Sequence, residues 1–222
     1  MTRKFGRLLA RDKRDAKYLL PPPRKKPRNR KSYRYWHANG WWGDQKLSPY
    51  CVGFAWAHWL EDGPVTHRGK PPIEKPISIY NDAQMVDEWE GEDYEGTSVR
   101  AGAKVLKKRG YIEQYRWAND IDDVIYTLLY RGPMVVGTWW YEHMSHPDAQ
   151  TIMDVSGFNM GGHAYLLNGI NTKTDLIRVK NSWGRDWGNA GHAYIAIDDF
   201  AELLADEGEA CLAIEMHSDC CD

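Results

Sequence analysis

The stretch from Val179 to Gly188 reads Val-Lys-Asn-Ser-Trp-Gly-Arg-Asp-Trp-Gly, and it decides the fold. The apolar segment Leu176–Lys180 leads into it, and its glycines indicate a turn at the end of a strand. Further upstream, Gly161-Gly162-His163-Ala164 leads into a second apolar segment of the same kind. We therefore predict that this part of the chain is mainly β-sheet.

Outward from this stretch, the chain divides into a helical half and a mainly β half, with the change at Gly132-Pro133. The expected helices are Cys51–Leu60, Ser78–Trp89, Ser98–Arg109 capped by Thr97, and one capped by Asn119 or Asp120. The expected strands are Met134–Trp140, His163–Ile170, Leu176–Lys180, His192–Ile197 and Cys211–Met216, with a short helix at Asp199–Asp206. This order predicts an α+β fold with two lobes and a cleft between them.

Cys51 opens a stretch that is too apolar for a surface helix and therefore predicts a buried one. A helix N-terminus carries free N–H groups and a partial positive charge, which favour the thiolate form of a cysteine. A nucleophilic Cys51 is thus one interpretation. A small hydrophobic side chain packed in the core is the other.

Four polar residues resemble the catalytic set of the papain-like cysteine peptidases: Gln45, Cys51, His163 and Asn181. They keep the family's order and its six-residue separation between Gln and Cys. The resemblance covers roughly Trp41 to Met216. It implies a papain-like two-lobed fold, in which a helical lobe and a β-barrel-like lobe hold the active site in the cleft between them.

The resemblance also implies an endopeptidase that works through a thiolate–imidazolium pair and an acyl-enzyme, without a cofactor or a metal. Cys51 would be the nucleophile, and His163 would take its proton and pass it to the leaving amine. Asn181 would orient His163, and Trp183 would cover their hydrogen bond. Gln45 would donate to the oxyanion together with the backbone N–H of Cys51.

Two glycines are predicted to contact the backbone of a peptide or protein substrate, Gly96 and Gly162. The sequence departs from the family pattern at Pro49, where a glycine usually lines the groove, and at Val52, where tryptophan is usual. These departures leave two alternatives open. One is a catalytically silent papain-fold module for structure or binding, anchored by its basic tail. The other is a related amidase, such as a peptidoglycan cross-bridge hydrolase.

Charge divides the chain more sharply than its formal net charge of −2 suggests. Residues 1–34 hold 14 Lys and Arg against two acidic residues, and the remainder holds 15 against 29. We predict a basic tail over 1–34, a helical lobe over 35–131, a β lobe over 132–217 and a C-terminal tail over 218–222. The basic tail is expected to lie outside the catalytic machinery, as an arm that positions the body or governs access to its cleft.

An acidic partner is predicted for this tail: nucleic acid, an acidic protein surface or the chain's own body. A short helix is conceivable over Lys4–Leu20. Hydrophobic residues make up 42% of the chain, which excludes a disordered protein, and its four cysteines do not make a disulfide scaffold. We see no transmembrane segment and no signal peptide, and expect a cytoplasmic or intracellular location, or a virion-associated one if the source is a phage.

Overall fold

The computed structural model describes residues 3–9, 13–21, 31–36, 41–63, 74–91 and 93–215. The basic run from Arg24 to Arg30 and the predicted tail 218–222 lie outside these residues. The helices are α1 (Cys51–Asp62), α2 (Pro76–Gln84), α3 (Val99–Lys108), α4 (Ile121–Tyr130) and α5 (Ile197–Ala205), with short 3-10 helices η1 (Lys13–Tyr18) and η2 (Glu142–Ser145). The strands are β1 (Tyr33–Tyr35), β2 (Ile112–Trp117), β3 (Met134–Tyr141), β4 (Asn159–Asn171), β5 (Leu176–Lys180), β6 (His192–Ala196) and β7 (Glu209–Glu215).

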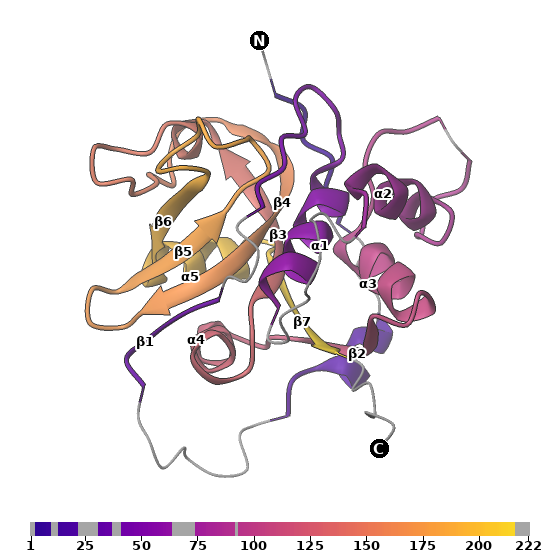
Figure 1. Cartoon of the computed structure of the whole chain (residues 1–222), viewed down its shortest axis with the longest axis horizontal. Coiled ribbons are helices and arrows are strands. Elements are labelled where there is room, and N and C mark those ends of the chain that lie inside the picture. The colour runs from indigo at the N-terminus through magenta and orange to yellow at the C-terminus, as the bar shows by residue number, and fades with distance from the viewer. Residues whose placement is uncertain are drawn as a thin grey trace.

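All strand pairs in the described chain are antiparallel, in the order β2-β7-β3-β4-β5-β6, and β1 joins β4. Figure 1 shows α1, α2 and α3 together on one side of the central strands, with β5 and β6 on the other. The mixed α+β architecture predicted from the sequence is confirmed. The exact lobe boundaries remain a prediction.

Strands β3 and β4 separate two hydrophobic cores, because successive side chains on a strand point to opposite faces. Val135, Ala164 and Leu166 pack with the buried face of α1 and with α3. Val136 and Leu167 belong to the other core, which includes residues of α4, α5 and β5. Residues of one strand thus reach both halves of the molecule.

Helix α1 is the buried helix that the sequence predicts, and nearly all of its residues are buried. Close packing explains its glycine, since a Cβ on Gly53 would lie 2.2 Å from the carbonyl oxygen of Pro76. At its other end, Asp62 accepts a hydrogen bond from the Lys180 ammonium group at 2.7 Å, and both side chains are fully buried. This ion pair ties α1 to the end of β5, immediately before Asn181.

Several local predictions need correction. The N-cap of α3 is Ser98, whose hydroxyl accepts from the Ala101 N–H, and not Thr97. Helix α2 ends at Gln84 rather than Trp89, since the side chains of Asp87 and Glu88 bond instead to residues 94–104. Strands β1 and β2 were not predicted. Asp120 does cap α4, by accepting from the Asp123 N–H.

The suggested helix over Lys4–Leu20 is wrong for residues 4–9 and 19–20, which are not helical. Residues 13–18 form the 3-10 helix η1, and residues 10–12 lie outside the described residues. We call residues 3–9 the cleft segment. Among the described residues, no helix is both long and apolar enough to cross a membrane.

Candidate active site

Cys51 is the first residue of α1, as predicted, and its side chain is completely buried. No side chain caps this helix and no acidic residue lies in its first turn. The backbone of Ala164, Gly6 and Val52 acts to lower the pKa of the thiol. Burial nevertheless dominates and raises the pKa of the Cys51 thiol. The predicted thiolate is therefore not the favoured form here, because water is excluded from the sulfur.

His163 and Asn181 form the pair that the sequence predicts. His163 Nε2 lies 2.9 Å from Asn181 Oδ1, and both side chains are fully buried. The same oxygen accepts the backbone N–H of Ser182 at 2.8 Å, which identifies it as the carbonyl end of the amide. Nε2 therefore carries the proton that is donated to Asn181. Nδ1 is buried and has no hydrogen-bond partner among the described residues.

Four aromatic rings surround the His163 imidazole. Between centroids, Trp140 lies 4.8 Å from it, Trp183 5.4 Å, Phe5 5.6 Å and Tyr165 6.0 Å. This enclosure lowers the pKa of His163 to about 4; the Asn181 hydrogen bond acts in the opposite direction, and the positive charge of Arg3 lowers the pKa further. The imidazole is consequently neutral at pH 7, so a thiolate–imidazolium pair is not formed in this state.

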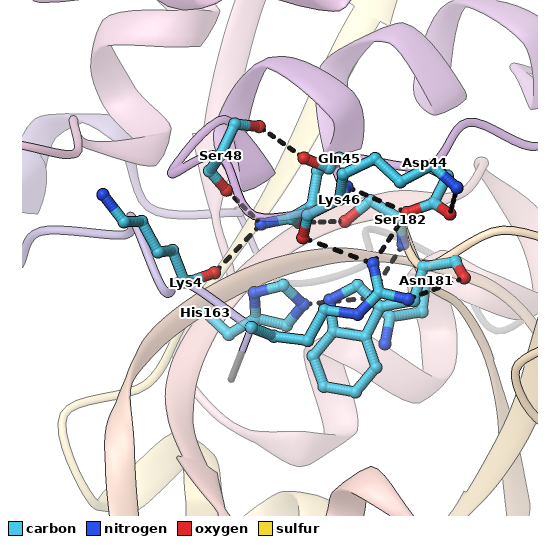
Figure 2. A network of polar contacts seen from close by, with 10 residues as sticks. Lys4, Asp44, Gln45, Lys46, Ser48, His163, Asn181 and Ser182 are labelled. Carbon is cyan, nitrogen blue, oxygen red and sulfur yellow. Dashed lines mark hydrogen bonds and ion pairs between the residues drawn. The ribbon is translucent and has the colours of Figure 1, made fainter. Parts of the chain in front are cut away.

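Gln45 is held beside Asn181 by the segment that follows β5. Its backbone N–H donates to the Ser182 carbonyl at 2.8 Å, and its Oε1 accepts from the Ser182 hydroxyl at 2.5 Å. Figure 2 shows this arrangement, with the Gln45 amide directed toward Ser48 and Lys4. Its Nε2 donates to the carbonyl oxygens of Ser48 at 2.8 Å and Lys4 at 3.0 Å. The amide predicted to stabilise an oxyanion thus already binds a carbonyl of the cleft segment.

The cleft segment runs directly across these residues, hydrogen bonding on both sides. On one side, the Thr97 N–H donates to the Gly6 carbonyl and the Leu8 N–H donates to the Thr97 carbonyl, both at 2.9 Å. On the other side, the Arg7 N–H donates to the Gly162 carbonyl at 2.9 Å. The prediction that the N-terminal tail lies outside the catalytic machinery is therefore wrong for residues 3–9.

Glycines allow this close approach. A Cβ on Gly6 would lie 1.9 Å from the Pro49 carbonyl oxygen, and one on Gly162 would lie 2.2 Å from the Arg7 carbonyl oxygen. Gly96 has a φ of +113°, and its Cβ would lie 2.7 Å from the Gly6 carbonyl. Both predicted substrate-contact glycines thus line the path of the cleft segment. Gly162 pairs with the Arg7 backbone, but on the other side the pairing is made by Thr97, because the Gly96 N–H donates to the Tyr80 hydroxyl instead.

A cavity of about 690 Å³ opens where the cleft segment passes Trp183. Arg3 and Phe5 line it on one side, and Asp186 and Trp187 on the other. The Arg3 guanidinium bonds to the Asp44 carboxylate at 2.7 Å and lies 5.4 Å from the centre of the Trp183 ring. The cavity therefore lies beside Arg3 and Phe5 of the cleft segment.

Sequence reasoning found Gln45, Cys51, His163 and Asn181, and the structure brings the last two into direct contact. It missed Trp140, Thr97 and Arg7, which join the site from distant segments. For Trp140 a signal was present: it pairs with Gly161 in the β3–β4 register, next to the motif. No group of three His, Cys, Asp or Glu side chains suited to a metal ion occurs within the described ranges.

Comparison with known proteins gives a consistent result. The family model "Papain family cysteine protease" matches residues 74–210, which include His163 and Asn181 but begin after Gln45 and Cys51. A "Cysteine protease" from Blomia tropicalis is 28% identical over 127 residues, covering 55% of this chain and 35% of that protein. The chain spans less than two thirds of the length of the curated relatives it matches.

Solved structures show the same fold over a longer part of the chain. The crystal structure of xylellain, a cysteine protease from Xylella fastidiosa, superposes with a TM-score of 0.78 at 18% identity, covering 98% of this chain and 99% of that one. A digestive procathepsin L 3 from the larval midgut of Tenebrio molitor gives a TM-score of 0.65 at 15% identity, over 89% and 74% of the two chains. At these sequence identities the structural similarity shows a shared fold and nothing more.

Proposed function

The chain belongs to the papain family of cysteine proteases, and from this premise we propose that it hydrolyses peptide bonds through an acyl-enzyme on Cys51. The observation that carries the proposal is the hydrogen bond from His163 Nε2 to Asn181 Oδ1. This bond fixes the tautomer in which Nδ1 has a lone pair. Nδ1 is then the atom that accepts the thiol proton.

In the proposed reaction, the Cys51 sulfur attacks the substrate carbonyl and its proton passes to His163 Nδ1. The C–N bond breaks as His163 returns this proton to the leaving amine, which leaves a thioester on Cys51. Water, deprotonated by His163, then hydrolyses the thioester and regenerates the thiol. Asn181 holds the imidazole in one orientation during both proton transfers, and Trp183 and Trp140 shield their hydrogen bond from water.

The oxyanion of each tetrahedral intermediate would be stabilised by Gln45 Nε2 and the Cys51 backbone N–H at the start of α1. Gln45 Nε2 now donates to the Lys4 carbonyl, and this contact supports its ability to bind a carbonyl oxygen at this point. In acyl-transfer enzymes the loss of one such donor lowers turnover about 100- to 1,000-fold.

We also propose that the protein is latent while the cleft segment is in place. His163 protonates the leaving amine, so the leaving part of a substrate lies beside His163, where Phe5 now packs. The acyl part would then lie toward Arg7, because Gly6 separates Arg7 from Phe5 and lies against Pro49, two residues before Cys51. A substrate runs from its acyl part to its leaving part, whereas the cleft segment runs from Phe5 to Arg7. Its reversed direction explains how it fills the site without being cleaved.

A peptidyl epoxide that reacts with activated thiols tests this function. Applied to the intact chain and to Arg7→Ala, it should label Cys51, faster in the variant, with the adduct mapped by mass spectrometry. Cys211 is an internal control, since it is also a buried cysteine. Cys51→Ala should abolish the adduct. Folded, reduced protein that acquires no adduct at Cys51 in either form would refute the proposal.

A further inference from the structure

Thr97 points its backbone toward the cleft segment and its side chain toward the body of the protein. Its N–H donates to the Gly6 carbonyl and its carbonyl accepts from the Leu8 N–H, both at 2.9 Å. On the other side, the Thr97 hydroxyl donates to Oδ2 of Asp87 at 2.7 Å, and Thr97 is completely buried. The residue that pairs with an extended main chain is therefore tied to a carboxylate 10 positions earlier in the sequence.

The other oxygen of Asp87 fixes the same stretch of chain at two further points. Oδ1 accepts the Tyr94 hydroxyl at 2.7 Å and the Trp89 backbone N–H at 3.2 Å. Hydrogen bonds to an ionised acceptor are about twice as strong as those between neutral groups. A single carboxylate thus joins three points of the connection between α2 and α3.

This connection depends on side-chain bonds because it has little regular backbone pairing of its own. Between α2 and α3 the described residues form no helix and no strand. The Gln84 side chain donates to the carbonyl oxygens of Tyr94 and Gly96, each at 3.3 Å. Backbone groups that lack partners in a helix or sheet must find them in this way. Of the side chains that hold this connection, that of Asp87 bonds to Thr97 itself.

The adjacent carboxylate, Glu88, has different partners. It accepts from the Ser98 hydroxyl at 3.0 Å, from Arg100 at 3.2 Å and from Lys104 at 3.1 Å, all on α3 or its N-cap. Glu88 therefore stabilises α3, whereas Asp87 fixes the residue that pairs with the cleft segment. Two neighbouring carboxylates thus differ in whether they reach that residue, which provides a matched comparison.

We propose that Asp87 is a positioning residue for the main chain of the substrate. Through the Thr97 hydroxyl, it holds the Thr97 backbone in the conformation that pairs with an extended peptide. The inference rests on the proposed function and deepens it, since the cleft segment here takes the place of that peptide. Asp87 touches no reacting atom, so its loss should weaken substrate binding and leave the chemical step almost unchanged.

Steady-state kinetics of the full chain carrying Arg7→Ala, which removes the ion pair of the cleft segment with Glu209, provide the first test. The substrate is a fluorogenic peptide long enough to pair with Thr97. Adding Asp87→Ala should raise KM at least about 10-fold, the effect of losing a charged hydrogen bond, and change kcat less than about 3-fold. Asp87→Asn keeps a side chain that can bond to the Thr97 hydroxyl and should give a KM between the two.

Thr97→Val separates the role of the hydroxyl from a general effect on folding. Valine keeps the shape of the side chain and the backbone that pairs, so the bond to Asp87 is what is lost. KM should rise, and adding Thr97→Val to Asp87→Ala should cause no further increase, because both remove the same bond. Glu88→Ala is the matched control and should leave KM within about 3-fold. An unchanged KM in Asp87→Ala or Thr97→Val, or effects of the two that multiply, would overturn the inference.

Hydrogen exchange in the intact chain decides the matter when no hydrolysis is detected, because the cleft segment then serves as the bound peptide. The Leu8 N–H donates to the Thr97 carbonyl, and its protection factor should fall at least about 10-fold in Asp87→Ala. In Glu88→Ala it should change less than about 3-fold. Unchanged protection at Leu8 in Asp87→Ala would refute the positioning role, whereas absence of hydrolysis and of labelling at Cys51 refutes only the protease function.

Discussion

At His163, burial and hydrogen bonding shift the pKa of the imidazole in opposite directions. Enclosure by aromatic rings lowers the pKa to about 4, although the acceptor Asn181 favours the protonated ring. Burial likewise raises the pKa of the Cys51 thiol. Both groups are therefore neutral while the cleft segment covers them. Activation then requires water or substrate to reach Cys51 and His163. The position of the cleft segment therefore determines whether these two groups can exchange a proton.

Asn181→Ala should destabilise the fold as well as slow the reaction. It removes the acceptor for His163 Nε2 and for the Ser182 N–H, and leaves two buried donors unpaired. We expect the free energy of unfolding in urea to fall by about 1–3 kcal/mol. Asn189→Ala is a suitable control, because Asn189 is exposed, and should change it by less than about 0.5 kcal/mol. An unchanged midpoint for Asn181→Ala would contradict the role assigned to this bond.

Acid should loosen the cleft segment. The pKa of His163 is about 4 with the segment in place, against an ordinary value of 6.5. Burial in the folded protein causes this shift, and Phe5 of the cleft segment is one of the rings that enclose the imidazole. The stability that the neutral imidazole contributes is therefore fully present above pH 6.5 and is lost as the pH falls toward 4. The opposite holds for Cys51, whose raised pKa weakens the closed form above its ordinary value of 9.0.

Hydrogen exchange measures this loosening at two amides, those of Arg7 and Leu8, which donate to Gly162 and Thr97. Between pH 7 and pH 4 their protection factors should fall. In His163→Gln the fall should be much smaller, since the titrating group is gone. Protection that stays constant with pH in the unmodified chain would show that His163 does not couple to the segment.

Among the secondary-structure elements, those with strong local signals were predictable and those set by tertiary contacts were not. Helices α1 and α4 begin where the apolar run at Cys51 and the acidic cap at Asp120 place them. Strand β2 escaped prediction because a bulge between Ile112 and Gln114 breaks its alternation. Helix α2 ends early because Asp87 and Glu88 bond to the segment before α3, which no local pattern reveals.

The cleft segment is the element that sequence reasoning misjudged most. Its apolar residues were compatible with a helix, but its backbone donors and acceptors pair with Thr97 and Gly162 instead. The Arg7–Glu209 pair joins residues 202 positions apart in the sequence, so no local sequence pattern could predict it. His163 and Asn181 were predictable because recognisable motifs flank them in the sequence. Thr97 and Glu209 join the site through contacts between distant segments, and no motif marks them.

Gly6→Ala should release the cleft segment. The added methyl group would lie 1.9 Å from the Pro49 carbonyl oxygen, and a clash of this kind costs about 1–3 kcal/mol. We expect alkylation of Cys51 by iodoacetamide to become about 10-fold faster. Glu113→Ala is the control, because Glu113 is exposed on β2. Equal alkylation rates for Gly6→Ala and the intact chain would show that the cleft segment does not restrict access of the reagent to the Cys51 thiol.

Over the whole molecule, the division of charge has a structural counterpart in the described residues. Three cations of the basic tail bind carboxylates of the acidic body: Arg3 pairs with Asp44, Lys4 with Glu95 and Arg7 with Glu209. The chain's own body was one of the acidic partners predicted for the tail. The first pairs are partly exposed and are screened by salt, whereas Arg7 is enclosed and is therefore the anchor.

The central claim is that Cys51 catalyses peptide hydrolysis in a cleft that residues 3–9 close. The most direct test is the rate at which a fluorogenic peptide is hydrolysed by the intact chain, Arg7→Ala, and Arg7→Ala with Cys51→Ala. The account predicts at least about 10-fold faster hydrolysis by Arg7→Ala than by the intact chain, and none by the double variant. Equal rates for the intact chain and Arg7→Ala, or hydrolysis that survives Cys51→Ala, would contradict it.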